Sequence, residues 1–569
     1  MLPAKKQVSL VCPKTDKSRK HKRKHDWFTW IFPTGGLLAL IWFLIRVIPK
    51  PSRATYPCQR VAFPLASAFM VWLIGVIGSV TAIRKAKRSF AQSRYVLCVI
   101  LVAVSIGCVW LAQSITTEQV VLADEPVANA PIGIAKGIHP GRVVWIHDPD
   151  ATEWDGPGDG HWWQSSHTNQ AVVDKMMSRA IKALSGDADS TTAWDKLFKH
   201  FNKTHGRGNV GYKSGEKILI KVNFVGCIRI WNRRKVTRIE DYNLRSSDYM
   251  NTSPQMIIAL LRQLVDEVGV KEADITVGDP LCYFPNEYYD MCREKFPNVR
   301  YLEYLGKFGR TGAKLSSVAL YWSTPDAAGK MTDYVPISYV KADYLINLAN
   351  LKSHNDQAGV TLCAKNHYGS LVRKPARSPG YYDMHKDLPY TTPGTGHYRP
   401  LVDLMGHKHL GGKTLLYLID GLYAGKHAKE RSPRKWNSAP FNGDWSSSLF
   451  VSQDPVAIDS VGFDFLWTEW NDAPHRSGAN DYLIEAALAD NPPSGTFYDP
   501  DHKGNVVRLA SLGVHEHWDN PTDKRYSRNL GAGKGIELIK VTGAVHTRAS
   551  TKVCTGIKQV SLVAGISEN

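Results

Sequence analysis

The sequence predicts an α/β fold, with a mainly parallel sheet flanked by helices in a large soluble domain and three transmembrane helices before it. Three observations lead to this prediction. Strand-like and helix-like segments alternate from residue 142 onward, which is typical of a parallel sheet with covering helices. Long uncharged apolar runs are confined to the first 115 residues, and those runs have basic flanks.

The basic excess of the chain lies near its amino terminus. The 569 residues include 71 Lys+Arg and 52 Asp+Glu, which gives a formal net charge of +19. Residues 1–115 hold 18 of the basic residues and 2 of the acidic ones, whereas residues 116–569 hold 53 and 50. Charge concentrated beside apolar runs is typical of membrane topology, so we expect a membrane partner and no nucleic-acid partner.

Three uncharged apolar runs predict a membrane anchor over residues 27–115. The runs are Trp27–Ile45, Val61–Ile83 and Tyr95–Ile115, with 19, 23 and 21 residues. A helix needs about 20 residues to cross the hydrocarbon core of a bilayer. Residues 1–26 form a basic tail with nine Lys/Arg, and the loop RKAKRSFAQSR holds five more. Positive flanks remain cytoplasmic, so we expect a cytoplasmic amino terminus and an extracytoplasmic carboxy-terminal domain, at the inner or plasma membrane.

After a polar linker over residues 116–141, alternating segments indicate one domain over residues 142–569. Strands are predicted at Arg142–His147, Lys217–Phe224, Asp274–Gly278, Val299–Tyr304, Tyr344–Leu348 and Thr414–Ile419. Helices are predicted at Asn169–Leu184, Pro254–Val268, 287–295 and Asp454–Trp467. Thr252 or Ser253 is expected to cap the second of these helices, and Asp454 the last. The Pro/Gly-rich stretch Pro375–Pro400 is the candidate for a functional loop.

Polar side chains follow four of the predicted strands. In an open parallel sheet, ligands bind beyond the carboxyl ends of the strands, so these side chains are expected at one edge. The candidates there are Lys221, Asn223, Asp279, Lys352, His354 and Asp420, and Lys365 and Asn366 follow in the motif AKNHYG. Lysine ammonium groups suit a phosphate or a carboxylate, and an asparagine amide offers both a donor and an acceptor. The pattern therefore predicts a site for an anionic ligand.

Three of the polar residues also have a purely structural interpretation. Lys221 could be a solvated lysine at the sheet edge, and Asp279 before a proline could serve only a turn. Asp454 before Pro455 is first a helix cap.

A metal or redox site is the alternative chemistry. His354 and His367 could ligate a metal, and Cys227, Cys282 and Cys363 are expected near the same edge. No paired ligand spacing accompanies them, so the cofactor stays open, with a divalent metal as one option. In an oxidising compartment, Cys282 and Cys292 could instead form a local disulfide.

Six short motifs, taken in order, resemble the domain of unknown function 362 family. They are NTSP at 251–254, VGDP at 277–280, LKSH at 351–354, LCAKNHYG at 362–369, IDGL at 419–422 and SQDPVAID at 452–459. The resemblance covers about residues 215–470 and implies a bacterial source. The family is often linked to iron–sulfur proteins, and many members carry a ferredoxin-like C-x-x-C-x-x-C-x-x-x-C-P module. This chain has no such motif.

The resemblance supports several candidates without supplying a reaction. The residues at the motif positions are Asp279, Lys352, His354, Lys365, Asn366, Asp454 and Asp459. The first hypothesis is a membrane-anchored enzyme for an anionic small molecule or envelope component. In it Lys352 and Lys365 hold the anion, Asp279 and Asp459 act as acid–base groups or metal ligands, and His354 transfers a proton. The alternatives are a metal- or redox-handling protein and a non-catalytic binding module.

Overall fold

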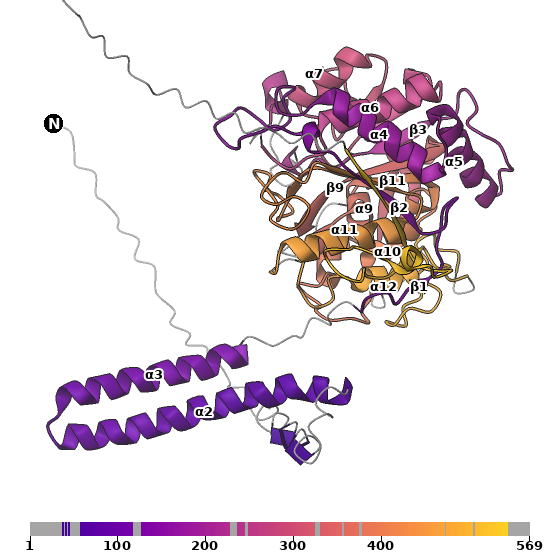
Figure 1. Cartoon of the computed structure of the whole chain (residues 1–569). Coiled ribbons are helices and arrows are strands. Elements are labelled where there is room, and N and C mark those ends of the chain that lie inside the picture. Colours follow the sequence, from indigo (N-terminus) through magenta and orange to yellow (C-terminus); the bar gives the residue numbers. More distant parts are fainter. Residues whose placement is uncertain are drawn as a thin grey trace, which may run out of the picture. The chain divides into compact units, whose positions relative to one another are not determined.

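The computed structural model describes most of the chain in two compact units, which are treated separately. The described residues are 37–45 except 39 and 43, 57–117, 127–227, 236–244, 248–324, 331–354, 358–374, 378–472, 474–504 and 507–543. The first unit is Met1–Leu122 and the second is Ala123–Asn569. Figure 1 shows helices α2 (Pro57–Ala91) and α3 (Tyr95–Thr117) of the first unit packed as a hairpin.

In the residues that it describes, the structure does not show the predicted three-span anchor. The second and third apolar runs coincide with α2 and α3, whereas most of the run Trp27–Ile45 lies outside the described residues. Within the described ranges, the structure contains no helix with both the length and the apolar character needed to cross a membrane.

The second unit is built on a mixed sheet, which confirms the α/β class. The strand order is β14-β2-β12-β11-β9-β3-β4-β5-β6, and β10 pairs with β9. The bounds are β2 Arg142–His147, β3 Ile218–Lys221, β4 Ile275–Gly278, β5 Arg300–Glu303, β6 Thr311–Gly312, β9 Tyr344–His354, β10 Gly359–Thr361, β11 Thr414–Gly425, β12 Ser448–Ser452 and β14 Glu537–Thr542. Strands β11, β9, β3, β4, β5 and β6 are parallel to one another, and β14 is parallel to β2. Strands β12 and β10 pair in the antiparallel sense.

Helices cover both faces of this sheet. Figure 1 shows α4 (Gln170–Ser185), α5 (Ser190–Thr204), α6 (Pro254–Arg262) and α7 (Asn286–Lys295) over one face. Helices α9 (Cys363–Asn366), α10 (Pro400–Gly406), α11 (Pro455–Glu469) and α12 (Asp481–Ala487) lie over the other. Because side chains alternate along a strand, Ile218 and Ile220 enter the core under α4 and α6, and Leu219 enters the second core. Burial on both faces explains why these strands are continuous apolar runs in the sequence.

The smaller elements lie around the sheet. Strands β7 (Leu315–Tyr321) and β8 (Thr332–Pro336) form an antiparallel pair that leads into α8 (Ile337–Lys341). Strand β1 (Ile132–Gly133) pairs with β13 (Val514–His515), so the predicted linker 116–141 contains a short strand.

The predicted strands and helices agree with the structure in position and differ in length. Strand β9 continues from the predicted Leu348 to His354, whereas β3 ends at Lys221, before the predicted Phe224. Ser253 caps α6, because its side chain accepts a hydrogen bond from the Met256 amide at 3.2 Å. Asp454 caps α11 in the same way, accepting from the amides of residues 456 and 457 at 3.0 and 2.9 Å.

The strand order reverses direction between β3 and β9. The chain passes from β3 outward to β4, β5 and β6, and then returns to the opposite side of β3 to form β9 and β11. In open α/β sheets, ligands bind at the carboxyl ends of the strands that flank such a reversal. The carboxyl ends of β3 and β9 are therefore the place where the topology favours a site.

Candidate functional site

A buried ion pair lies at the carboxyl ends of β3 and β4. Lys221 is the last residue of β3, and Asp279 directly follows β4. The Lys221 Nζ is 2.9 Å from the Asp279 Oδ2, and the two residues are only 0% and 3% exposed. Lys221 Nζ also donates to the Val222 carbonyl and, at 2.9 Å, to Asn366 Oδ1. An ammonium group has three donors, so these three acceptors fit a protonated Lys221.

Two asparagine side chains connect this ion pair to the end of β9. Asn366 lies at the end of α9, and its Oδ1 accepts from Asn223 Nδ2 at 3.1 Å as well as from Lys221. The Asn366 Nδ2 donates to Asn347 Oδ1 on β9 at 2.7 Å. Asn223 in turn accepts from Lys352 Nζ at 2.8 Å through its Oδ1. A continuous chain of hydrogen bonds thus joins two lysines from neighbouring strands.

Lys352 has a different environment from Lys221. Its Nζ is fully buried and donates to Asn223 Oδ1 and, at 3.0 Å, to the Met250 carbonyl. Among the residues that the structure describes, no carboxylate lies within ion-pair distance of this amine. A neutral amine has two N–H groups, and the two neutral acceptors of Lys352 match that number.

Burial lowers the pKa of Lys352 from 10.5 to about 7. The charges of Lys365 and Lys221 lower this pKa further, while Cys282 and Asp279 oppose the shift. The physical cause is desolvation, which disfavours the charged form of an amine. At neutral pH this amine is therefore divided between its charged and neutral forms.

We call Lys221, Asn223, Asp279, Lys352 and Asn366 the lysine network. All five were predicted as site residues, and they come from β3, β4, β9, α9 and the segments that follow the strands. The network contains two amines and one carboxylate, so it carries an excess of positive charge whenever both amines are protonated. Buried charge without a partner is costly, and the network can lose this excess by releasing a proton or by binding an anion.

Three further residues, Asn347, Thr252 and Asn350, complete the network and were not predicted as site residues. Asn347 on β9 holds Asn366, as described above, and donates to the Cys363 carbonyl at 2.9 Å. The Thr252 hydroxyl accepts from the Asn223 amide and donates to Asn350 Oδ1, both at 2.8 Å. The signal was present in the sequence, because two asparagines interrupt the apolar run YLINLAN and a buried polar side chain needs a partner.

Gly369 packs directly against the Lys221–Asp279 pair. A Cβ atom at this position would lie 2.8 Å from Lys221 Nζ and 2.9 Å from Asp279 Oδ1. Gly369 is itself partly exposed, in the 3-10 turn His367–Ser370 that follows α9. The turn thus covers the ion pair, and only a glycine lets its backbone approach so closely.

The other basic candidates are close in the chain to residues of the network, on α9, in the turn after it and at the end of β9. Lys365 is partly buried on α9, and its Nζ is 4.5 Å from the Tyr368 ring centroid. His354 is the buried last residue of β9, opposite Gly359. Burial lowers the pKa of His367 to about 3, and the charge of Lys221 adds to this effect. His367 is thus a neutral, buried ring beside the network.

Three predicted aspartates, Asp420, Asp454 and Asp459, accept hydrogen bonds from backbone amides. Asp420 on β11 accepts from the amides of Ser253 and Leu422 at 2.8 and 3.1 Å. Asp459 on α11 accepts from the amides of residues 363 and 364 at 2.8 and 3.0 Å. Burial raises the pKa of Asp459 to about 7 and that of Asp454 to about 6. Asp459 thus positions the start of α9, which carries Lys365 and Asn366, and its catalytic role stays a prediction.

The comparison with known families concerns this same part of the chain. Residues 241–464 match the model of the family described as domain of unknown function (DUF362). This match confirms the resemblance seen in the motifs. No curated protein and no solved structure matched the chain. The DUF362 match includes Asp279, Lys352 and Asn366, whereas Lys221 and Asn223 precede it, so the network extends beyond the matched segment.

Cys282 and Cys292 do not form the local disulfide that the sequence left open as an alternative. Cys282 and Cys292 are both buried thiols, and burial raises the pKa of each. Cys227 lies beside Cys282, because the Tyr283 amide donates to the Cys227 carbonyl at 3.3 Å. In the described part of the chain, no three His, Cys, Asp or Glu residues are arranged to hold a metal ion. The candidate ligands His354, His367, Cys227, Cys282 and Cys363 are therefore not gathered as a metal site there.

Arg399 makes several of the contacts that hold the described part, 378–400, of the candidate loop Pro375–Pro400. Arg399 is buried and forms an ion pair with Asp481, with Nε and Oδ2 2.8 Å apart. Its Nη1 donates to the Thr392 hydroxyl at 3.0 Å, and its Nη2 to the Gly394 carbonyl at 2.6 Å. These contacts give Arg399 a structural role in shaping this segment.

Proposed function

We propose that this protein is an enzyme that acts on an anionic small molecule or an anionic envelope component at the lysine network. The observation that carries the proposal is the excess of buried amines over carboxylates in a hydrogen-bonded network at the reversal point of the sheet. An anion beside Lys352 would supply the missing negative charge and stabilise its protonated form. The half-buried Lys365 adds a further positive charge near this amine.

The two lysines of the network have different roles in this proposal. Lys221 is neutralised by Asp279 and fixes the positions of Asn366 and Asn223. Lys352 faces two neutral acceptors and has a pKa of about 7, so it can release and accept a proton near neutral pH. We assign Lys352 as the acid–base group and Lys365 as an anion-binding group. His354, the last residue of the same strand, is the second candidate for proton transfer.

The proposed location of this enzyme is a membrane, with residues 1–26 in the cytoplasm and the second unit outside it. The support is the sequence: three uncharged runs of 19, 23 and 21 residues and the basic residues that flank them. Fractionation and protease treatment of intact cells test the location. Digestion of the second unit from outside supports it, and complete protection in the cytosolic fraction contradicts it.

Binding of two simple anions tests the site. Inorganic phosphate and malonate are titrated by calorimetry into the full-length protein and its Lys352→Met variant. We expect at least one anion to bind and the variant to bind it roughly tenfold or more weakly, about 1.4 kcal/mol. Lys413→Met is the matched control, because Lys413 is a buried lysine bonded to three backbone carbonyls elsewhere in the fold. Equal binding by wild type and Lys352→Met contradicts the proposal.

Turnover separates the enzyme from a non-catalytic binding module. The protein is incubated with a mixture of carboxylated and phosphorylated metabolites, and mass spectrometry follows each component. We expect wild type to consume a component that Lys352→Met leaves intact. Binding of phosphate or malonate without any turnover favours the binding module instead.

A further inference from the structure

The helical hairpin of the first unit has small and polar residues in its seam. The buried residues of α2 include Ser79, Ala82, Ala86 and Ser89, and Ser105 of α3 is also buried. The hydroxyl oxygens of Ser79 and Ser105 are 2.8 Å apart, in a hydrogen bond between the two helices. Seams of small residues with hydroxyl hydrogen bonds are typical of helices that pack in lipid. In water, helices pack through their large apolar residues.

Most of the large apolar side chains whose exposure is described on this hairpin point outward, although Phe69 of α2 is buried. On α3, Val96 is 77% exposed, Val99 68% and Ile106 65%. The other exposed large apolar residues of the hairpin are Met70, Ile77, Val80, Ile83, Phe90, Tyr95, Leu97, Ile100, Val102 and Val104. An apolar surface of this kind on a pair of helices indicates an apolar partner. In a hairpin that is stable in water, large apolar residues fill the seam; here small and polar residues lie in the seam and large apolar residues are exposed.

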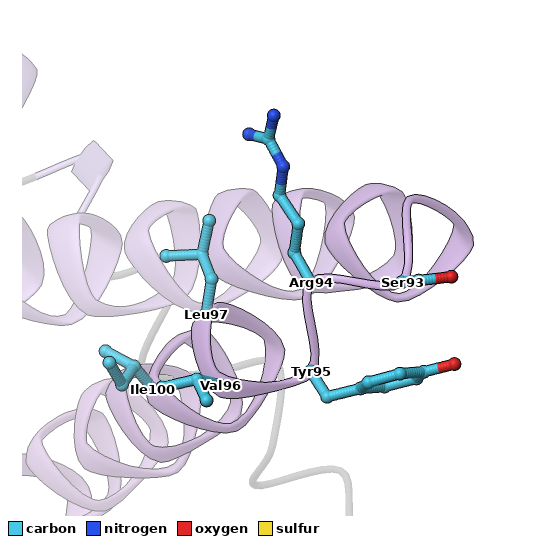
Figure 2. Close-up of a pocket in the computed structure, with 6 residues that line it drawn as sticks. All are labelled: Ser93, Arg94, Tyr95, Val96, Leu97 and Ile100. Carbon is cyan, nitrogen blue, oxygen red and sulfur yellow. The ribbon is translucent and has the colours of Figure 1, made fainter.

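One end of the hairpin is strongly basic. The exposed residues near the turn include Arg84, Lys85, Lys87, Arg88 and Arg94, and residues 57–117 contain no Asp or Glu. Figure 2 shows the Arg94 side chain extending from the turn, away from the apolar side chains of Val96 and Ile100. These three residues, with Ser93, Tyr95 and Leu97, line an open hollow at the turn. Positive charge and apolar surface therefore lie next to each other at this end.

We propose that the α2–α3 hairpin docks into a lipid bilayer whose surface is anionic. The basic turn binds the phosphate groups of anionic lipids, and the exposed apolar side chains contact the acyl chains. Charge complementarity selects this partner over a soluble protein surface, because five cations without any acidic residue match an anionic lipid surface. The inference rests on the proposed membrane location and adds the lipid chemistry that the turn recognises.

Flotation of the full-length protein with vesicles tests this inference. The protein is synthesised in a cell-free system with vesicles of phosphatidylcholine alone, or of phosphatidylcholine with one third phosphatidylglycerol. We expect stronger flotation with the anionic vesicles, and we expect this preference to weaken as salt is raised. In the variant with Arg84, Lys85, Lys87 and Arg88 changed to Gln, we expect roughly tenfold less preference for anionic vesicles.

Two controls identify the part of the hairpin that acts. A matched variant changes four exposed lysines of the second unit to Gln, at Lys175, Lys203, Lys213 and Lys271, and we expect it to keep the preference. The double substitution Val96→Asn and Val99→Asn keeps the basic turn, and we expect it to reduce flotation on both vesicle types. Equal flotation of wild type on both vesicle types would overturn the lipid inference and leave the location standing. No flotation on either type would overturn both.

Discussion

Buried lysines lie at both the carboxyl and the amino ends of the sheet strands, and Lys352 and Lys413 have different surroundings. At the carboxyl edge, Lys352 bonds one side-chain oxygen and one carbonyl. At the amino edge, Lys413 lies just before β11 and donates to the carbonyls of Tyr339, Val340 and Ala342 at 3.0, 3.1 and 2.7 Å. Two of these carbonyls belong to α8 and the third to the residue that follows it, so Lys413 caps a helix carboxyl terminus.

Burial, neighbouring charges and hydrogen-bond partners together distinguish a structural lysine from a reactive one here. Lys413 uses all three donors of an ammonium group, and burial lowers its pKa only to about 8. Lys352 has two acceptors and two lysine neighbours, and its pKa falls to about 7. Lys221 has three acceptors, one of them a carboxylate. Of these three lysines, Lys352 is the one arranged to exchange a proton or to gain an anion.

The largest effect is expected when the lysine of the ion pair is removed. Lys221→Met leaves Asp279 buried without its cation, and we expect a loss of about 3–5 kcal/mol in the free energy of unfolding, measured by urea denaturation. The double variant Lys221→Met/Asp279→Asn should recover part of this loss, because it no longer buries an unpaired charge. A double variant whose loss equals the sum of the two single losses would contradict the pairing.

Lys413→Met should lower stability without changing anion binding, whereas Lys352→Met should weaken anion binding with little change in stability. Lys413→Met leaves three carbonyls without a donor, and we expect a loss of about 2–3 kcal/mol with unchanged anion binding. Lys352→Met loses two hydrogen bonds but also removes a desolvated amine beside two other lysines. We therefore expect a stability change within about 1 kcal/mol and weakened anion binding. Similar stability losses in the two variants would remove the distinction between the two edges.

Gly369→Ala should disturb the carboxyl edge without changing its charges. The new Cβ atom would meet the Lys221 Nζ and the Asp279 Oδ1 at under 3 Å, and overpacking of this kind costs about 1–3 kcal/mol. Gly533→Ala is the matched control, because nothing lies within 4 Å of its Cβ position. Thermal unfolding of the two variants measures the difference. Equal melting temperatures would show that the turn His367–Ser370 moves to accommodate the new methyl group.

The smallest effect is the change in the free energy of unfolding between pH 7 and pH 8. Between pH 7 and 10.5 the unfolded chain holds the Lys352 proton and the folded chain has lost it, so stability rises with pH. The slope from this one group is at most about 1.4 kcal/mol per pH unit. For Lys413 the same rise begins near pH 8. Urea denaturation of wild type and Lys352→Met at pH 7 and 8 measures the difference, and equal slopes would show that the Lys352 amine does not titrate there.

Strand positions were predictable because strands buried on both faces are continuous apolar runs. The rule that ligands bind at the carboxyl ends of parallel strands predicted that Lys221, Asp279 and Lys352 lie at one end of the sheet. The structure shows that side chains from the carboxyl ends of β3, β4 and β9 meet there.

Pairing partners could not be predicted, because they depend on distances between segments far apart in the chain. Asp420 and Asp459 occur in motifs as distinctive as the one that contains Asp279, yet both bind backbone amides. Only the structure distinguishes a carboxylate that pairs with a lysine from one that caps a turn. The two acceptors of Lys352 are 102 and 129 residues away in the chain. The residues next to Lys352 in the sequence therefore could not predict its buried environment.

The pairing of β2 with β14 has a consequence for biosynthesis. The first strand of the sheet is complete at residue 147, but its parallel neighbour spans residues 537–542, and Arg142 binds Glu537 across 395 residues. At about 5–20 residues per second, a ribosome needs ~20–80 s to make that intervening chain. During that time the apolar strand RVVWIH lacks this neighbour, and an uncovered strand edge invites aggregation. We therefore expect expression of the full chain to depend on chaperones that bind nascent segments. This dependence should be stronger than for a fold whose strands pair with near neighbours in the sequence.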